Sequence, residues 1–416
     1  MNERKMTERK TEVMTKKLLL LGGSAQQVVA IKTAKRLGFE TILCDFLPDN
    51  PGQYAADKFY LVSTTDKEAV LDVARKERID GVLAYASDPA APTAAYVAEK
   101  LGLPGNPYKS VEILCNKDKF RRFLAQNDFA APTAHSYVTR EEALTDRAKL
   151  NYPLIIKPVD SSGSKGATVL RTEEGLAEAI EFAFSFSRCH RVVIEDFIEK
   201  KHPYLIGGDV FISNGKVVLW GLMNCHRDSR VNPLVPVGKS YPLQLEAPDT
   251  ANVKATVERL VNLLKIANGS MNVELVVDKS GRVWPIDIGP RAGGNMIPDL
   301  LGDIFGVDVA QMSVEAAMGR EVRECPHEPK GCYATCNLHS AKNGIYKGIS
   351  FAPELEQYIY RKCIYKKEGD KIEFFDNAAK CLGIIFMKFP DEKQMFDMMN
   401  RMDELVYIDL EYQSEE

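Results

Sequence analysis

A stretch rich in serine and glycine follows a short apolar strand in the first half of the chain. The strand, YPLIIKP, delivers Lys157, and a second lysine, Lys165, lies among the small residues behind it. Small residues let backbone N–H groups curl around phosphate oxygens, and the lysines add positive charge. No GKS or GKT opens a helix here, so the stretch is not a P-loop, and a plain mobile hairpin loop is the alternative. The pattern predicts a nucleoside triphosphate site whose small residues are Ser161, Ser162, Gly163, Ser164 and Gly166.

Two carboxylates are expected to face each other across a hairpin further along the chain. The hairpin runs from Ser270 to Ile288 and puts Glu274 on one strand and Asp287 on its partner. Two facing carboxylates repel unless a cation lies between them, and hard oxygen ligands suit magnesium that bridges phosphates. Asn272 shares a strand face with Glu274, because side chains alternate along a strand. The pair predicts a magnesium site. The alternative is that either acid faces solvent, which is less common for Asp287 inside the apolar run VWPIDIGP.

A single arginine, Arg291, follows Asp287 by four residues in the glycine-rich loop PRAGGN. A planar guanidinium beside magnesium-bound phosphate can stabilise the charge on a transferring phosphoryl group and on an acyl oxyanion. The alternative, a surface arginine that caps a turn, fits this loop less well. We therefore expect Arg291 to act in phosphoryl or acyl transfer.

A long polar segment, NCHRDSRVNPLVPVGKS, lies between two strand-like runs, and such long connections often carry function. Its cations could bind a carboxylate, and its histidine could take a proton from an amine. Each of them, taken singly, fits a solvated loop charge better than a substrate contact. As a group they are the predicted substrate contacts: His226, Arg227, Arg230, Asn232 and Lys239.

The elements that must position these residues begin with a regular alternation of strands and helices. From Lys17 the pattern is KLLLLGG, QQVVAIKTAKRLG, ETILCDF, a helix from Thr65, and a strand at GVLAYAS. This alternation predicts a parallel sheet with right-handed crossovers. Asp88 follows the last strand, where open parallel sheets place ligand groups, although a helix N-cap is the alternative. The turn Gly22–Ser24 lacks a full GxGxxG fingerprint, which disfavours a dinucleotide site.

The pattern changes near Asn116, where a basic amphipathic helix leads into short strands. Residues 152–209 read as a small α+β unit, followed by a hairpin, the long polar segment, a helix at ANVKATVERLVNLLKIA and the carboxylate hairpin. A third, strand-rich region begins near Glu324 and includes YATCNLHS and CLGIIFMKF. The chain is thus expected to fold as several α/β and α+β units.

Composition limits the class of protein. A chain of 416 residues is expected to form two to four structural units, and its net charge of -4 offers no basic field for nucleic acid. The apolar run LLLLGG is too short for a signal peptide or a membrane span, so we expect a cytoplasmic protein with a frayed N-terminal tail.

The nine cysteines include no CxxC pair, which disfavours disulfides. A zinc site is a minor alternative at a loose cluster of Cys325, His327, Cys332, Cys336 and His339.

Taken in order, these motifs resemble the ATP-grasp superfamily, in the biotin-carboxylase-like branch that includes L-amino-acid ligases. The resemblance runs from Lys17 to the C-terminus and is most specific between Asn116 and Asn295. It implies a disordered tail over 1–16 and an N-terminal Rossmann-like domain over 17–112. An ATP-grasp domain over 113–323 follows, with a lid subdomain over about 130–205. A C-terminal α+β domain then covers 324–416.

The resemblance also implies a role for each matching residue. Lys117 and Lys157 would hold phosphates under a lid that spans residues 161–166, and Arg291 would be the arginine of the ligase motif. Glu195 would meet the adenine amino group, with Asp209 on the ribose and Glu274 and Asp287 on magnesium. The backbone of Asp196, Phe197 and Ile198 would complete the adenine edge.

Two positions depart from the family pattern. Asp287 stands where many relatives have a glutamate, so the second carboxylate is shorter. Gly289 stands where many relatives have an asparagine ligand, and Asn295 or Asn272 could compensate. Within the substrate site, the residues expected to contact substrates are Asp88, His226, Arg230 and Asn295.

The activity implied by the resemblance is ATP-dependent ligation of a carboxylate to an amine through an acyl phosphate, with release of ADP and phosphate. ATP and Mg²⁺, or Mn²⁺ in its place, would be the cofactors, and the partners would be small-molecule acids and amines. Nucleic acid and membrane are not expected partners, and a homodimer is left open. Two alternatives remain: a bicarbonate-dependent carboxylase of the same superfamily, and an ATP-binding regulatory protein without turnover.

Overall fold

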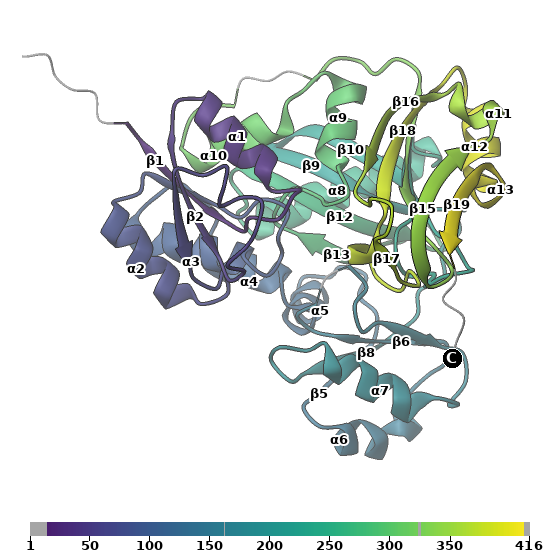
Figure 1. The fold of residues 1–416 in the computed structure, drawn as a ribbon. Helices are drawn as coiled ribbons and strands as arrows, with labels where there is room; N and C mark the ends of the chain where they lie inside the picture. Colours follow the sequence, from purple (N-terminus) through teal and green to yellow (C-terminus); the bar gives the residue numbers. More distant parts are fainter. Residues whose placement is uncertain (1–14, 162, 323–325, 412–416) are drawn as a thin grey trace, which may run out of the picture.

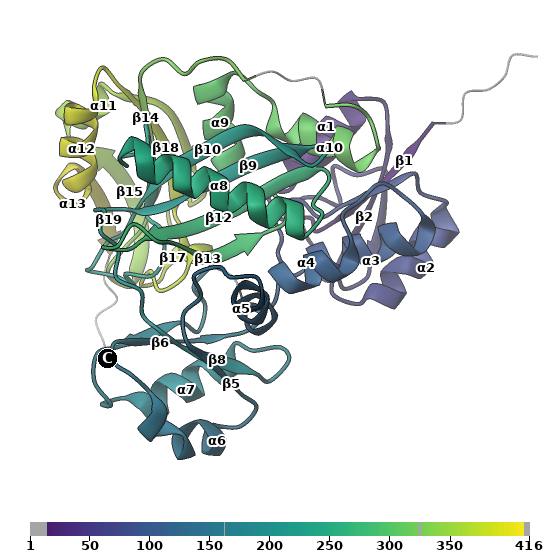
Figure 2. The same cartoon turned by 180° about the vertical axis from the view of Figure 1, so that it is seen from behind.

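The structure, a computed structural model, describes residues 15–161, 163–322 and 326–411. An N-terminal unit with a parallel sheet packs against a body built around a large sheet, and a small antiparallel unit projects from that body (Figure 1). The view from behind shows α8 (Ala247–Leu263) lying along one face of the large sheet (Figure 2). The proposed tail, residues 1–16, lies almost wholly outside the described residues.

The predicted parallel sheet at the N-terminus is confirmed, with strand order β3-β2-β1-β4. The alternating leucines of β1 divide between two cores: Leu19 and Leu21 pack with α2 and α3, and Leu18 and Leu20 pack with α1 and α10. Helices therefore cover both faces, as parallel sheets require. The elements are β1 (Lys17–Leu21), α1 (Val28–Arg36), β2 (Glu40–Asp45), β3 (Lys58–Leu61), α2 (Lys67–Glu77), β4 (Gly81–Leu83), α3 (Ala91–Leu101) and α4 (Tyr108–Leu114).

The projecting unit is an antiparallel sheet in the order β5-β8-β6-β7. Its core lies between β6 and β8 on one side and α7 on the other, with Ile156, Ile180 and Ile194 fully buried. Helix α5 (Lys117–Gln126) connects this unit to the N-terminal unit. The other elements are β5 (Ala134–Tyr137), α6 (Arg140–Thr145), η1 (Arg147–Lys149), β6 (Leu154–Pro158), β7 (Thr168–Leu170), α7 (Leu176–Ser185) and β8 (Val192–Asp196).

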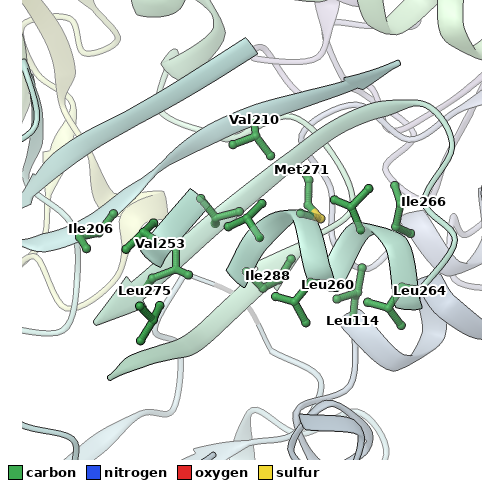
Figure 3. Close-up of a cluster of buried hydrophobic side chains, with 14 of the residues drawn as sticks. Leu114, Ile206, Val210, Val253, Leu260, Leu264, Ile266, Met271, Leu275 and Ile288 are labelled. Carbon is green, nitrogen blue, oxygen red and sulfur yellow. The ribbon is translucent and has the colours of Figure 1, made fainter. Parts of the chain in front are cut away.

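The large sheet has eight strands in the order β13-β12-β9-β10-β11-β14-β18-β16. Apolar side chains of α8 pack on one face, where Val253 and Leu260 meet Met271 and Leu275 (Figure 3). Helix α9 (Ile297–Phe305) packs on the opposite face. The strands are β9 (Leu205–Ser213), β10 (Lys216–His226), β11 (Gly238–Tyr241), β12 (Gly269–Val277), β13 (Val283–Gly289), β14 (Cys332–Leu338), β16 (Ile359–Ile364) and β18 (Gly383–Phe389).

The strand-rich C-terminal region is confirmed, but three of its strands extend the large sheet instead of forming a sheet of their own. The remaining strands, β15, β17 and β19, form a small antiparallel sheet. Across the described ranges, no helix is long and apolar enough to span a membrane. The remaining elements are α10 (Val309–Ala317), β15 (Gly344–Phe351), α11 (Pro353–Glu356), β17 (Lys371–Ile372), η2 (Ala378–Lys380), α12 (Glu392–Asn400), α13 (Met402–Leu405) and β19 (Val406–Glu411).

The core under α8 generates a stability prediction. Leu260 is fully buried there, so Leu260→Ala should lower the free energy of unfolding by about 2–5 kcal/mol, through lost apolar contact and a residual cavity. Leu263 lies on the same helix with 44% of its surface exposed, and Leu263→Ala is the matched control. Urea denaturation of both variants would check the prediction. Equal losses would contradict the packing described.

Candidate active site

The two predicted carboxylates face each other across the edge of the large sheet. Glu274 on β12 pairs with Asp287 on β13, whereas Leu275 pairs with Pro285, so a β-bulge falls at Ile286. Residues in direct register project to the same side. Val273 and Leu275 are buried toward α8, which leaves Glu274 and Asp287 on the opposite face, with 26% and 43% of their side chains exposed.

Each carboxylate has a cation nearby, at a distance that is long for an ion pair. Lys117 Nζ is 3.8 Å from Asp287 Oδ2, and Arg227 Nη2 is 3.7 Å from Glu274 Oε1. Burial opposes ionisation of Asp287, but Lys117, Lys157, Arg121 and Arg291 outweigh it and hold the pKa of this carboxyl below its usual value. Asp287 is therefore available as a charged oxygen donor.

The donor chemistry of this pair fits a hard divalent cation. Among the residues that the structure describes, no group of three or more His, Cys, Asp or Glu side chains could hold a metal ion. Glu274 and Asp287 would thus supply only part of a coordination shell, and phosphate oxygens and water would have to supply the rest, as is usual for magnesium. The loose zinc cluster gains no support from the described residues, and its Cys325 lies outside them.

A buried ion network joins the projecting unit to the large sheet. Lys157 Nζ on β6 is 3.0 Å from Glu195 Oε2 on β8, and Arg121 of α5 binds both oxygens of Glu195, each at 3.1 Å. Arg121 Nη2 also donates to the Ile286 carbonyl at the bulge, at 2.7 Å. Burial lowers the pKa of Lys157 despite Glu195, whereas the two cations outweigh burial and lower the pKa of Glu195.

Arg121 is missing from the residues predicted from the sequence. It lies beside Phe120 and three residues before Leu124, both buried, whereas Arg122 points to solvent. The helical spacing of positions 121 and 124 is the signal that could have identified it as an inward-facing cation.

The glycine- and serine-rich loop lies over Lys117. Lys117 Nζ donates to the Ser161 carbonyl at 2.7 Å, and Ser164 Oγ donates to the Leu234 carbonyl at 2.8 Å. Gly163, Ser164 and Gly166 all have positive φ, a conformation that glycine adopts without strain. Lys165 is exposed, and Ser162 lies outside the described residues. A pocket of about 230 Å³ beside this loop is lined by groups that include Asp88, Lys117, Ser161 and Asp287.

Most of the groups predicted to bind the adenine base already form hydrogen bonds within the protein. The Asp196 N–H donates to the Thr133 carbonyl and the Phe197 N–H to the Pro153 carbonyl, both at 3.0 Å. The Glu195 carboxylate is bound to Arg121 and Lys157. Hydrogen bonds from this strand to a base would therefore have to come from carbonyl groups or from Ile198.

The Asp209 carboxylate, which the resemblance assigns to the ribose, is bound by groups within the protein. Its side chain is buried in β9, where Asn272 Nδ2 donates to Oδ1 at 2.8 Å and the Gly293 N–H donates to Oδ2 at 2.6 Å. Burial raises the pKa of this carboxyl against those two donors. Asp209 therefore connects β9 to β12 and to the loop after β13. The amide nitrogen of Asn272 donates in this contact to Asp209.

Arg291 is not a surface arginine, because only 13% of its side chain is exposed. Its Nη2 forms an ion pair with Asp88 Oδ2, and its Nη1 donates to the Ala292 carbonyl at 3.1 Å. The alternative role for Asp88 as a helix N-cap is wrong, because α3 is capped at Ala90 without a side-chain bond. Asp88 and Arg291 thus connect the N-terminal unit to the large sheet.

His226 contradicts the expectation that it accepts a proton. The ring is buried, its Nε2 lies 2.8 Å from Ser240 Oγ, and it packs against Tyr204. Burial, with Lys239 and Arg227 nearby, lowers the pKa of His226 to about 3. A base this weak stays neutral at physiological pH and would gain a proton poorly.

Of the other polar residues predicted to bind substrates, two cations converge on Cys225, and one of them, Arg227, also lies beside Glu274. Arg227 Nη1 and Lys239 Nζ lie 2.7 and 3.0 Å from Cys225 Sγ. Arg230 instead forms ion pairs with Asp228 and Asp403, at 2.6 and 3.1 Å. The second of these connects it to the C-terminal region. Asn232 similarly binds the Asp376 carbonyl at 2.9 Å. Asn295 adopts a left-handed conformation at the start of α9, with φ of 52°.

Solved structures share this fold over nearly the whole chain. An L-amino acid ligase from Bacillus licheniformis has a TM-score of 0.77 and 24% identity, covering 96% of this chain and 99% of that one. A phosphoribosylglycinamide synthetase from Anaerococcus prevotii has a TM-score of 0.73 and 21% identity, covering 95% and 100%. The biotin carboxylase domain dimer of the Hydrogenobacter thermophilus 2-oxoglutarate carboxylase, solved with MgADP, ADP and bicarbonate, has a TM-score of 0.69 and 18% identity, covering 95% and 91%.

Two matches to family models identify an ATP-grasp protein. Residues 31–105 match the ATP-grasp N-terminal domain, and residues 116–325 match the carbamoyl-phosphate synthase L chain, ATP binding domain. Because the second match spans half of the chain, the chain belongs to that family.

Curated relatives share only part of their length with this chain. The carbamoyl phosphate synthase large chain of Thermotoga petrophila is 28% identical over 292 residues, which is 69% of this chain and 26% of that protein. The formate-dependent phosphoribosylglycinamide formyltransferase of a Synechococcus strain is 34% identical over 193 residues, 45% of this chain and 49% of the relative. This chain thus spans about a quarter of the large synthase chains it matches.

The buried ion network predicts unequal effects at two neighbouring arginines. Arg121→Met would remove the hydrogen bonds from Arg121 to Glu195 and to the Ile286 carbonyl, while Glu195 would keep its ion pair with Lys157. We therefore expect a loss of about 1–3 kcal/mol in unfolding free energy, because buried acceptors would lose a charged donor. Arg122→Met is the control, because an exposed arginine should contribute less than about 1 kcal/mol. Urea denaturation of the two variants would measure both values, and a stable Arg121→Met protein would contradict the assigned network.

His226 predicts a pH dependence of stability. Its folded pKa lies below its unfolded value of about 6.5, so the unfolded chain binds more protons between roughly pH 6.5 and 3. Stability is therefore lost as the pH falls, by up to about 1.4 kcal/mol per pH unit from this residue. His226→Gln should reduce that slope in denaturation experiments, whereas the exposed control His190→Gln should leave it unchanged. An unaltered slope in His226→Gln would show that the histidine is not held neutral.

Proposed function

We propose that the protein is an ATP-dependent carboxylate–amine ligase that works through an acyl phosphate. The observation that carries the proposal is the in-register pair Glu274 and Asp287, bordered by Lys117 on one side and by the buried Arg291 on the other. Paired carboxylates suit a magnesium-bound triphosphate, and a guanidinium held rigidly beside them suits charge that develops during phosphoryl transfer. The names of the structural relatives, an L-amino acid ligase and a phosphoribosylglycinamide synthetase, support the same class of reaction.

Nucleotide binding is assigned to both units that border the pocket. Lys117, Lys157 and the loop over residues 161–166 would contact the phosphates, and the end of β8 would border the base. Glu274 and Asp287 would hold Mg²⁺ or Mn²⁺, which would neutralise the phosphate charge when bound. A relative solved with MgADP supports this cofactor assignment. That relative was solved as a dimer, and we extend the proposal to a homodimer of this chain on that basis.

The acid substrate is assigned to the side of the site that contains Arg227 and Lys239. Both cations are largely buried, and both contact the thiol group of Cys225. A buried cation without a full carboxylate partner gains from an anionic ligand, since burial of an unpaired charge is costly. We infer that these two residues, in place of His226 and Arg230, orient the substrate carboxylate.

The chemistry then follows in two steps. The substrate carboxylate oxygen attacks the γ-phosphorus of ATP, the bond from that phosphorus to the bridging oxygen breaks, and ADP leaves. The amine nitrogen next attacks the acyl carbon, the bond from that carbon to the phosphate oxygen breaks as the carbon–nitrogen bond forms, and the departing phosphate takes the proton that the amine loses. Arg291 would stabilise the charge in each step, and closure of the loop over residues 161–166 would exclude water from the labile acyl phosphate.

The proposal is tested by a phosphate-release screen over paired carboxylates and amines, with mass spectrometry of the products. Lys157→Ala and Glu274→Gln should each lower turnover by about 100-fold or more, because each removes charge complementarity at the transferring phosphate. Glu258→Gln, on the exposed face of α8, is the control and should retain full activity.

Three outcomes would redirect the assignment. Phosphate release that needs bicarbonate but no amine would indicate a carboxylase instead of a ligase. Tight ATP binding without turnover across the screen would indicate a regulatory protein. Unchanged turnover in Lys157→Ala or Glu274→Gln would show that the site takes no part in the reaction.

A further inference from the structure

The space beside Gly289 is filled by a side chain from another unit of the protein. Gly289 ends β13 two residues after Asp287, so a side chain at this position would project on the same face as Asp287. A Cβ atom built there would overlap Asp88 Oδ1 and would come within 3.1 Å of Arg291 Cζ. The φ of Gly289 lies outside the left-handed region, so glycine is needed here for space and not for backbone conformation.

The guanidinium of Arg291 is fixed by two acceptors from different units. Asp88, in the loop after β4 of the N-terminal unit, accepts from Nη2, and the Ala292 carbonyl accepts from Nη1 at 3.1 Å. The third donor, Nε, is buried and has no hydrogen-bond partner among the residues that the structure describes. Nε lies against Gly289, at 3.2 Å from the built Cβ position. The plane of the guanidinium is thus set by Asp88 together with the absence of a side chain at 289.

We propose that Asp88 is the positioning residue for Arg291 in phosphoryl transfer, and that glycine at position 289 is what allows this contact. The inference rests on the proposed function, because it assigns Arg291 to the charge of the transferring phosphoryl group. An asparagine side chain at 289 would occupy the space that the Asp88 carboxylate fills. The chain therefore uses a carboxylate contributed by its N-terminal unit where a side chain on β13 would otherwise stand.

The electrostatics agree with this arrangement. Burial alone would lower the pKa of Arg291, but Asp88, with smaller contributions from Asp209 and Asp287, raises it above its usual value. Arg291 therefore stays charged although it is mostly buried. Since a displacement of a catalytic group by about 1 Å can cost about 100-fold in rate, loss of Asp88 should affect the transition state far more than nucleotide binding.

The test measures the affinity of the full chain for ADP with Mg²⁺, in the absence and presence of aluminium fluoride, which mimics the transferring phosphoryl group. Asp88→Ala and Gly289→Ala should each weaken the aluminium fluoride complex by about 10-fold or more and change ADP affinity by less than about two-fold. Asp88→Asn, which keeps an acceptor for Arg291, should fall between wild type and Asp88→Ala. Gly348→Ala is the control, because a Cβ there meets no atom within 4 Å.

The double variant separates a loss of Arg291 positioning from a general disturbance of the protein structure. In Asp88→Ala/Gly289→Ala the overlap with the Asp88 carboxylate is gone, and only Arg291, which has already lost Asp88, must shift by a few tenths of an ångström. The loss in the double variant should therefore be close to that of Asp88→Ala alone. Additive losses, an unaffected Asp88→Ala protein, or an equal fall in ADP affinity would each overturn the inference and leave the proposed function standing. A wild-type protein that binds ADP no more tightly with aluminium fluoride would instead overturn the proposed function, and the inference with it.

Discussion

The site depends on the buried ion network of Arg121, Lys157 and Glu195. These three side chains come from α5, β6 and β8, and Arg121 also holds the backbone of the β13 bulge. Buried charges are tolerated only when paired with good geometry, so the network admits few relative positions of the two sheets. The distance between Lys157 and the carboxylates on the large sheet is therefore set by a contact that involves neither nucleotide nor metal.

Local patterns in the sequence were sufficient to predict the elements that carry the chemistry. The alternation of apolar and polar residues from Asn272 to Leu275 fixes which face each side chain occupies, and the register between β12 and β13 agrees with it. The strand and helix alternation from Lys17 likewise indicates a parallel sheet, because few other folds bury such runs on both faces. These predictions succeed because the relevant information lies within about ten residues.

Other contacts could not be predicted, because they depend on partners that are distant in sequence. Asp209 is an isolated acid in an apolar run, and nothing near it in the sequence indicates that Gly293 and Asn272 enclose it in the fold. His226 lies beside a polar segment, yet its ring packs under Tyr204, and Arg230 finds Asp403 near the end of the chain. Such pairings are not encoded locally, because they form only when segments that are distant in sequence come together in the fold.

The large sheet has a consequence for how this chain could be divided or recombined. β14 and β18 add to β11 of the central unit, so a boundary placed near residue 324 cuts through a continuous hydrogen-bonded sheet. Removal of the C-terminal region would expose the edge of β11 and apolar side chains that now pack against that region, a surface prone to aggregation. In this chain the C-terminal region is therefore continuous with the central unit and is not a separable module, which limits where the chain can be cut or fused.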